Sequence, residues 1–413
     1  MNHEFYIKNR KSLSDCLEDE SILVMFAGKA PYKSADETYP FTPNRNFYHL
    51  TGIDREKIIL VMTKRKGIVS ETLFIEESDP VMARWVGEKI TEAEAKEASG
   101  ITSIDYTKNF YDYFGNMLSR YEYSNLCLDL ERQEWGIPVT EAQKFAKEVK
   151  DRYPYFNIRN IYYKISDIRN IKSEEEVEVI KKAIEVTKRG IEALMKNARP
   201  DMMEYEIEAH FDYVLTSEGI RDKAFKTIAA SGKNATVLHY SENNSKCGEN
   251  DLILFDLGAQ YKYYSADITR TFPVSGKFTE RQKAVYNVVL KANEEVTKAV
   301  KPGVPFSELN EIAKKVLAEG CKQLGLIKES GELSKYYFHG VSHYLGLDTH
   351  DVGNREEVLK PGMVFTNEPG LYIPEENIGI RIEDDILVTE NGYENLSKDI
   401  IKTVEEIEEF MSR

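Results

Sequence analysis

Two aspartates, Asp256 and Asp267, interrupt a stretch of sequence that otherwise has the pattern of buried β-strands. Residues 252–257 read LILFDL and are apolar on both faces, as a fully buried strand requires. A second strand is predicted over residues 263–272, with Asp267 on one face and apolar side chains on the other. Burying a carboxylate is unfavourable unless it is paired, hydrogen-bonded or bound to a metal. The sequence therefore predicts a hairpin with two inward-facing acids that need a compensating partner.

For either aspartate alone, capping a turn or pairing with Arg270 would be the simpler interpretation. Further candidate ligands downstream favour a shared site instead. Three of the seven histidines fall within residues 335–353, Glu368 ends an apolar run, and one strand is predicted to present Arg381, Glu383 and Asp385 on the same face. The histidines in this group are His339, His343 and His350.

The composition of the chain excludes several kinds of binding partner and metal ligand. The net charge of −15 argues against nucleic acid, because binding phosphates needs clustered Lys and Arg. No apolar run reaches the length of a signal peptide core or a membrane span, so we expect a cytoplasmic protein with no membrane partner. The four cysteines show no CxxC spacing, which favours reduced thiols over a disulfide framework or a thiolate zinc site. A bound metal would have to be held by oxygen and imidazole.

The chain of 413 residues is predicted to form two domains. Residues 1–165 alternate strand-like and helical runs, which is an α/β pattern. The second domain, residues 166–413, opens with a long amphipathic helix whose capping box is Ser173 and Glu176. Within it, residues 199–215 align without gaps on a segment 102 positions later in the chain. This weak repeat indicates a duplicated unit with a site between its halves.

Two aspartates, two glutamates and one or more histidines form a mixed oxygen and nitrogen ligand set. Four carboxylates balance two divalent cations, and such a set suits manganese, magnesium or iron, while imidazole also tolerates zinc and cobalt. Two cations roughly 3.5–4 Å apart would hold a bridging water, lower its pKa and polarise a carbonyl or phosphoryl oxygen. The pattern therefore predicts a hydrolase, and leaves open whether it cleaves peptides or phosphoesters.

Five short motifs carry a resemblance to a known family: FDLGAQY, SADITRTF, HGVSHYLG, NEPGLY and RIEDD. Together they resemble the ligand set of the pita-bread metallopeptidases, and the wider match is to the Xaa-Pro aminopeptidase (aminopeptidase P) family. The segment SADETYPFTPNRNFYHLTGI resembles the amino-terminal domain of that family. The resemblance implies an α/β amino-terminal domain followed by an α+β pita-bread catalytic domain with an internal pseudo-twofold duplication.

The resemblance also assigns the metal ligands. Asp256 and Asp267 would hold one of two divalent metal ions, Asp267 and Glu383 would reach both, and His343 and Glu368 would complete the second. Mn²⁺ is expected, with Zn²⁺, Co²⁺ or Fe²⁺ as substitutes. A metal-bridging hydroxide would attack the carbonyl before proline, with Glu368 as general base and proton carrier. The substrates implied are peptides with proline at the second position.

Other residues are assigned supporting roles by the same resemblance. Three histidines match those that orient substrate and stabilise the tetrahedral intermediate: His239, His339 and His350. Arg381 would orient ligand carboxylates, an interpretation compatible with a plain ion pair. His49 and His210 lie outside the motifs and are interpreted as structural. The aromatic segment 39–53 and Trp85 would border the cleft of the same or a neighbouring subunit, since homodimers and homotetramers are common in the family.

The first hypothesis is thus an Xaa-Pro aminopeptidase, and the alternative is a prolidase that acts on Xaa-Pro dipeptides with the same ligands. A non-catalytic pita-bread binding module belongs to a different class, and the complete ligand set argues against it. A phosphoester hydrolase is disfavoured because the sequence has no Gly-rich phosphate loop.

Overall fold

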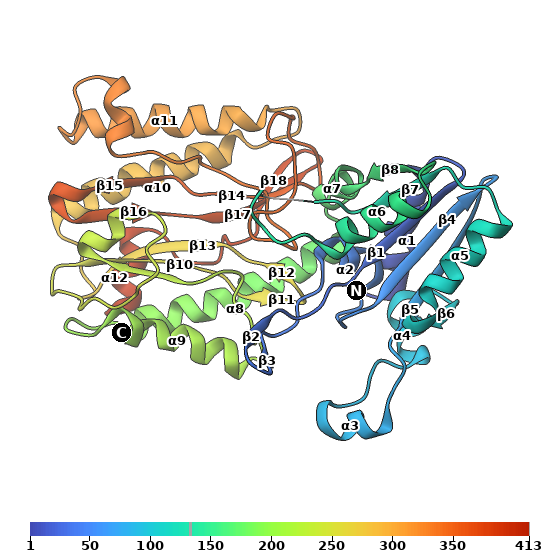
Figure 1. The fold of residues 1–413 in the computed structure, drawn as a ribbon. Coiled ribbons are helices and arrows are strands. Elements are labelled where there is room, and N and C mark those ends of the chain that lie inside the picture. Colours follow the sequence, from blue (N-terminus) through green and yellow to red (C-terminus); the bar gives the residue numbers. More distant parts are fainter. Residues whose placement is uncertain (132–133, 413) are drawn as a thin grey trace. The chain divides into compact units, whose positions relative to one another are not determined.

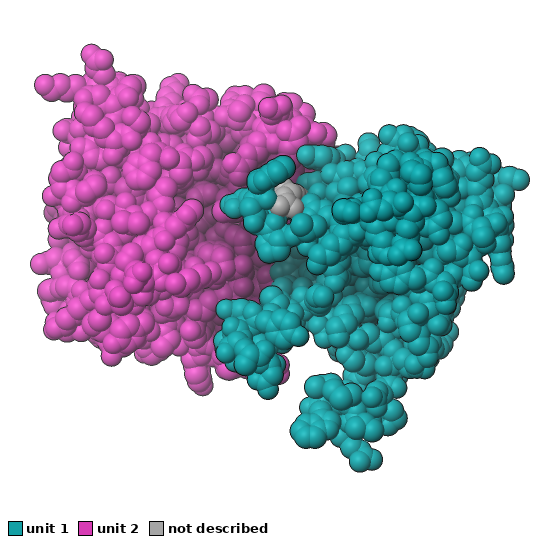
Figure 2. Space-filling view, viewed as in Figure 1, with its two compact units in different colours: residues 1–169 teal, residues 170–413 magenta. Residues whose placement is uncertain are grey.

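The computed structural model describes residues 1–131 and 134–412. It divides into two compact units, Met1–Arg169 and Asn170–Arg413, which are coloured separately in Figure 2. The sequence pattern places the boundary four residues earlier (169 − 165), after residue 165. Across the described residues, no helix combines the length and the apolarity that crossing a bilayer demands.

The amino-terminal unit is built on a six-stranded sheet (Figure 1). Its strands lie in the order β6-β5-β4-β1-β7-β8; the pairs β1–β4 and β4–β5 are antiparallel and the remaining pairs are parallel. Their bounds are β1 Ser21–Phe26, β4 Ile59–Arg65, β5 Ile68–Ile75, β6 Ile104–Tyr106, β7 Asn125–Leu128 and β8 Asn157–Asn160. Strands β2 (Tyr32–Ser34) and β3 (Glu37–Thr38) form a separate pair.

Helices cover both faces of this sheet. Strand β1, near its centre, has apolar side chains on both faces, and both must be shielded from water. Leu23 and Met25 of β1 pack in one core cluster, and Ile22 and Val24 pack in the other. The first cluster includes side chains of helices α1 His3–Asp15, α2 Arg45–Thr51, α4 Glu92–Ser99 and α7 Tyr162–Asn170. The second includes side chains of α5 Phe110–Arg120 and α6 Glu141–Arg152. The predicted α/β character is confirmed.

The carboxy-terminal unit repeats one pattern of two packed helices followed by an antiparallel sheet (Figure 1). In the first half, α8 (Glu174–Asn197) packs on α9 (Glu204–Ser217), and the sheet order is β13-β10-β9. In the second half, α10 (Glu280–Ala299) packs on α11 (Phe306–Gln323), and the order is β14-β17-β18. The predicted duplication is therefore present in the fold.

The strands of this unit are short, and a last helix follows them. The strands are β9 Ile228–Ser231, β10 Leu252–Leu257, β11 Gln260–Tyr261, β12 Tyr264–Ser265, β13 Ile268–Pro273, β14 Val364–Asn367, β15 Gly370–Ile373, β16 Ile378–Arg381, β17 Asp384–Thr389 and β18 Gly392–Asn395. Helix α12 spans Val404–Met411. The capping box of Ser173 and Glu176 begins α8 as predicted.

Two local predictions need correction. Residues 263–272 do not form one strand: β11 and β12 make a small hairpin of their own, and Asp267 lies just before β13. Residues 380–385 are likewise not one strand. Strand β16 pairs with β15 and β17 pairs with β14, so the chain changes sheets between them, at Ile382 and Glu383. Period-two patterning alone cannot reveal such a change of partner.

Gly258, which follows β10, permits the close approach of the segment that carries Asp267. A Cβ atom at Gly258 would lie 1.7 Å from the carbonyl oxygen of Ala266. We expect Gly258→Ala to destabilise this unit by about 1–3 kcal/mol, as overpacking does. At roughly 2–4 °C per kcal/mol, its thermal unfolding midpoint should fall by several degrees. Gly331→Ala is the control, because a Cβ there meets no atom within 4 Å. Equal midpoints for the two variants would contradict this account.

Candidate metal-dependent active site

Three of the predicted ligands form a compact buried group. Asp267, His343 and Glu383 each offer one ligand atom, and these atoms all lie within 4.8 Å of one another. Asp267 precedes β13, His343 lies in the loop that follows α11, and Glu383 lies at the sheet change between β16 and β17. The two halves of the duplicated unit therefore both contribute to the group.

His343 is oriented so that one ring nitrogen faces carboxylates. Its Nδ1 lies 3.0 Å from the carbonyl oxygen of Tyr344, which can only accept, so the proton is assigned to Nδ1. Burial, reinforced by His350, lowers the pKa of His343 to about 4, and the ring is neutral at pH 7. The lone pair on Nε2 then faces Asp267 Oδ2 at 3.3 Å and Glu368 Oε1 at 3.6 Å. This contact is repulsive unless a proton or a metal cation lies between the atoms.

The two remaining predicted ligands, Asp256 and Glu368, lie beside the group. Asp256 Oδ2 accepts a hydrogen bond from Arg381 Nη2 at 2.6 Å, while the buried Oδ1 has no hydrogen-bond partner among the described residues. Glu368 Oε1 is 3.4 Å from Thr366 Oγ1, and its Oε2 is 3.8 Å from Nδ1 of His339. An unpartnered buried carboxylate oxygen is the kind of atom that a metal ion satisfies.

Burial and crowding raise the pKa values of three of the predicted ligands, Asp267, Glu383 and Glu368, in the metal-free protein. Burial first, and then neighbouring acids, hold the pKa values of Asp267 and Glu383 well above their ordinary range. Burial, opposed by Arg381 and reinforced by Asp256, raises the pKa of Glu368 to about 8. Buried carboxylates that lack compensating positive charge suit hard divalent cations. The donor set thus fits the two metal ions that the sequence predicts.

Arg381 and His339 meet at one tyrosine hydroxyl that sequence reasoning missed. Tyr372 Oη lies 2.9 Å from His339 Nε2 and 2.9 Å from Arg381 Nη1. His339 Nδ1 donates to the carbonyl of Gly340 at 2.8 Å, so Nε2 accepts from the hydroxyl. Burial, reinforced by Arg381, lowers the pKa of His339 to about 4 and keeps the ring neutral. Tyr372 stands in the NEPGLY motif, and its position there was the available signal.

A second missed residue, Thr269, connects Arg381 to a predicted ligand. Its hydroxyl donates to Glu383 Oε2 at 2.6 Å and accepts from Arg381 Nε at 3.1 Å. Arg381 therefore contacts Asp256 directly and Glu383 through this threonine. The sequence pattern places Thr269 on the same face as Asp267, but it assigned Thr269 no role.

The other predicted histidines divide into two groups. The His350 ring stands edge-on to that of His343 at 4.3 Å, and burial, with Arg355 and His239, lowers the pKa of His350. His239 is exposed, and its proximity contributes to lowering the pKa of His339. His49, by contrast, is buried in the amino-terminal unit, edge-on to an aromatic ring of α1. His210 lies on α9, and its structural role stays a prediction.

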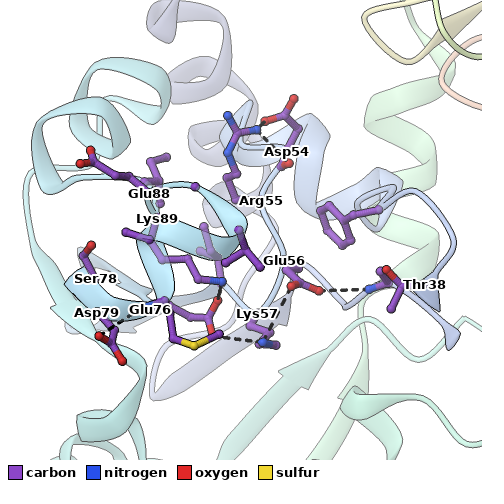
Figure 3. Close-up of a pocket in the computed structure, with 18 of the residues that line it drawn as sticks. Thr38, Asp54, Arg55, Glu56, Lys57, Glu76, Ser78, Asp79, Glu88 and Lys89 are labelled. Carbon is purple, nitrogen blue, oxygen red and sulfur yellow. Dashed lines mark hydrogen bonds and ion pairs between the residues drawn. The ribbon is translucent and has the colours of Figure 1, made fainter. Parts of the chain in front are cut away.

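The amino-terminal unit contains a cavity of about 1150 Å³ lined in part by the aromatic segment. Tyr39 and Phe41 lie on its wall, together with a cluster of charged side chains (Figure 3). Glu76 accepts from Lys57 at 3.2 Å and from Lys89 at 2.6 Å, so these charges already compensate one another. Helix α3 (Pro80–Val86) borders the cavity, but its Trp85 is 81% exposed. The predicted role of Trp85 in a cleft stays a prediction.

Comparison with known proteins agrees with this geometry. The sequence matches the profile of metallopeptidase family M24 over residues 178–390 and that of the aminopeptidase P N-terminal domain over residues 6–127. The Xaa-Pro aminopeptidase of Escherichia coli strain K12 is 32% identical over 100% of this chain and 98% of its own length.

Two solved structures are similar over the whole chain. A Bacillus anthracis protein provisionally assigned to aminopeptidase P is 56% identical, with a TM-score of 0.99 and coverage of 100% of this chain and 99% of its own. Escherichia coli aminopeptidase P bound to the inhibitor Pro-Leu is 31% identical, with a TM-score of 0.92 and coverage of 100% and 98%.

Fold and site together define a metal-dependent peptidase with a pita-bread catalytic domain. The chain belongs to metallopeptidase family M24 and, with its characteristic amino-terminal domain, to the aminopeptidase P group of that family.

The stability of the metal-free protein should depend on pH. A carboxyl whose pKa is raised by folding contributes stability at low pH and loses it as the pH rises through the folded pKa. For Glu368 that window runs from about 4.3, the unfolded value, to the folded pKa of about 8. We expect the thermal unfolding midpoint of chelator-treated protein to decrease as the pH is raised from 5 to 8. Saturating Mn²⁺ should restore the midpoint. A midpoint that changes with neither pH nor Mn²⁺ would contradict the raised pKa values of the clustered carboxyl groups.

Asp267→Asn should weaken the dependence on pH and abolish the effect of Mn²⁺, because it deletes one of the crowded charges and a proposed ligand. We expect the metal-free variant to fold and to lose less of its thermal midpoint over the same pH range. Added Mn²⁺ should no longer raise that midpoint. Glu311→Gln, at an exposed ion pair on α11, serves as the matched control and should behave as the unmodified protein. An Mn²⁺-dependent rise in the Asp267→Asn variant would remove Asp267 from the site.

Proposed function

We propose that this chain is an Xaa-Pro aminopeptidase, which removes the first residue of peptides that have proline second. The observation that carries the proposal is the buried ligand group around the unprotonated Nε2 of His343. The match to the aminopeptidase P N-terminal domain favours this activity over that of a prolidase. The inhibitor Pro-Leu on the Escherichia coli enzyme begins with proline, as does the peptide released by cleavage before proline.

Two divalent cations, Mn²⁺ above all, are the proposed cofactor. Asp256, Asp267 and Glu383 would hold one, and Asp267, Glu383, His343 and Glu368 the other, with Zn²⁺, Co²⁺ or Fe²⁺ as substitutes. When bound, the cations would activate water and polarise the carbonyl before proline. Hydrogen bonding of Asp256 Oδ2 to Arg381 leaves Oδ1 as the free ligand atom.

Glu368 is the proposed proton carrier of the reaction. Its carboxylate lies beside the proposed ligand His343, with Oε1 3.6 Å from Nε2, so it would stand next to a water held by the cations. The leaving nitrogen of proline carries no hydrogen in the peptide and must gain one as the bond breaks. Glu368 can accept a proton from the attacking water and deliver it to that nitrogen.

The neutral histidines around the group are proposed to bind and orient the substrate. His339 lies beside Glu368, with Nδ1 3.8 Å from Oε2, and His350 lies beside His343. His350 and His239 would stabilise negative charge on the tetrahedral intermediate, as preorganised donors do. Both ring nitrogens of His339 already have partners, so its proposed part is to orient the substrate. Arg381 is proposed to fix the carboxylate of Asp256 and, through Tyr372, the ring of His339.

Compartment and assembly are also proposals. All four cysteines are free, and burial raises the pKa values of Cys127, Cys247 and Cys321 to about 11, so these thiols are unreactive. Free thiols are typical of a reducing cytoplasm. We further propose a homodimer or homotetramer.

Substrate length separates the two candidate activities. We expect chelator-treated protein supplied with Mn²⁺ to cleave an Xaa-Pro-Yaa tripeptide before proline and to leave an Xaa-Ala-Yaa tripeptide intact. An Xaa-Pro dipeptide, the substrate of a prolidase, should be cleaved more slowly than the tripeptide. Liquid chromatography of the products measures all three. Cleavage of the dipeptide alone would establish the prolidase, and no metal-dependent cleavage of any substrate would contradict both.

A further inference from the structure

A buried layer of hydrogen bonds lies behind the proposed metal ligands, and a lysine from the carboxy-terminal end of the chain is part of it. Lys402 precedes α12, and its side chain is 21% exposed. Its Nζ donates to Asp384 Oδ2 and, at 2.9 Å, to Asn293 Oδ1. None of these three residues is among the proposed ligands or the residues that would touch substrate.

Asn293 connects α10 to the backbone before both glutamate ligands. Its Nδ2 lies 3.1 Å from the carbonyl oxygen of Asn367 and 3.3 Å from that of Ile382. These residues directly precede Glu368 and Glu383 in the sequence. Because Lys402 donates to the amide oxygen, it fixes which end of the Asn293 amide faces the two carbonyls.

Asp384 anchors the other side of the layer through Arg270, which is fully buried. Arg270 donates to Asp384 Oδ1 at 2.8 Å and to the carbonyl oxygen of Glu383 at 2.6 Å. Its remaining donors reach the carbonyls of Thr269, Ile400 and Ile401. The guanidinium thus joins β13, the sheet change that carries Glu383, and the segment that carries Lys402.

We propose that Lys402 is a positioning residue of the metal site: by fixing Asn293 and Asp384 together, it sets the backbone on which Glu368 and Glu383 stand. The carboxy-terminal segment is then required for metal affinity although it contributes no ligand. This inference rests on the metal site proposed above. Partners behind metal ligands typically change metal affinity by about 10–100-fold when removed.

Lys402→Met tests the role with little risk to folding. Methionine keeps much of the apolar stem, and Arg270 still compensates the buried charge of Asp384. The Asn293 amide oxygen, however, loses its donor, and only the bonds from Nδ2 to the two carbonyls then hold the amide. By isothermal titration of MnCl₂ into chelator-treated full-length protein, we expect the variant to bind Mn²⁺ about 10–100-fold more weakly. Its metal-free thermal midpoint should stay within a few degrees of that of the unmodified protein.

Lys283→Met is the matched control, since Lys283 also links α10 to the carboxy-terminal end through an ion pair, 3.3 Å from Glu408. It should leave Mn²⁺ affinity unchanged. A double-mutant cycle between Lys402 and Asn293 gives a further test. If Lys402 acts through Asn293, the double variant Lys402→Met/Asn293→Ala should bind Mn²⁺ about as weakly as Asn293→Ala alone.

The outcomes separate this inference from the function on which it rests. Unchanged affinity in Lys402→Met, equal losses in Lys402→Met and Lys283→Met, or fully additive losses in the double variant would each overturn the positioning role while the metal site stands. Absence of Mn²⁺ binding by the unmodified protein would overturn the site and the positioning role together.

Discussion

The carboxy-terminal unit is organised around a cluster of buried carboxylates whose mutual repulsion is relieved by protons in the metal-free protein and would be relieved by cations in the metal-bound one. Four carboxylates of the proposed ligand set face one guanidinium, that of Arg381, and an imidazole, His343, that burial keeps neutral. The lone pair of His343 Nε2 is directed at carboxylate oxygens 3.3 and 3.6 Å away. Two divalent cations would bring four positive charges to the four negative ones, which makes metal binding part of the stability of the unit as well as of its chemistry.

The duplicated fold shows how such an unfavourable cluster is assembled. Each half supplies two packed helices and a short antiparallel sheet. Of the proposed ligands, Asp256 lies in the central strand β10, whereas the other four lie in loops or just outside strand ends. Glu383 illustrates this, because it lies where the chain leaves one sheet for another and its N–H donates to the carbonyl of Thr269 at 3.1 Å. Around it, the backbone is held by Arg270 and Asn293.

The repeat at residues 199–215 was sufficient to predict the duplicated architecture. The buried acids indicated a site that needs a compensating charge, and the structure brings three of the predicted ligands together. The sequence failed where the answer depends on pairing between distant segments. The change of sheet at Glu383 is invisible to a period-two pattern, which continues unbroken across it. The roles of Asn293 and Lys402 rest on a hydrogen bond between residues 109 positions apart, and nothing in their local sequence distinguishes them from structural residues. Tyr372 lies in the NEPGLY motif, but its bonds to His339 and Arg381 could not be read from that motif.

Crystals grown with Mn²⁺, measured for anomalous scattering at the manganese edge, would test the central claim most directly. The account predicts two peaks roughly 3.5–4 Å apart, one bound by His343 Nε2 and the other by Asp256 Oδ1. A site without manganese, in which a protonated carboxyl donates a hydrogen bond to His343 Nε2 instead, would contradict it.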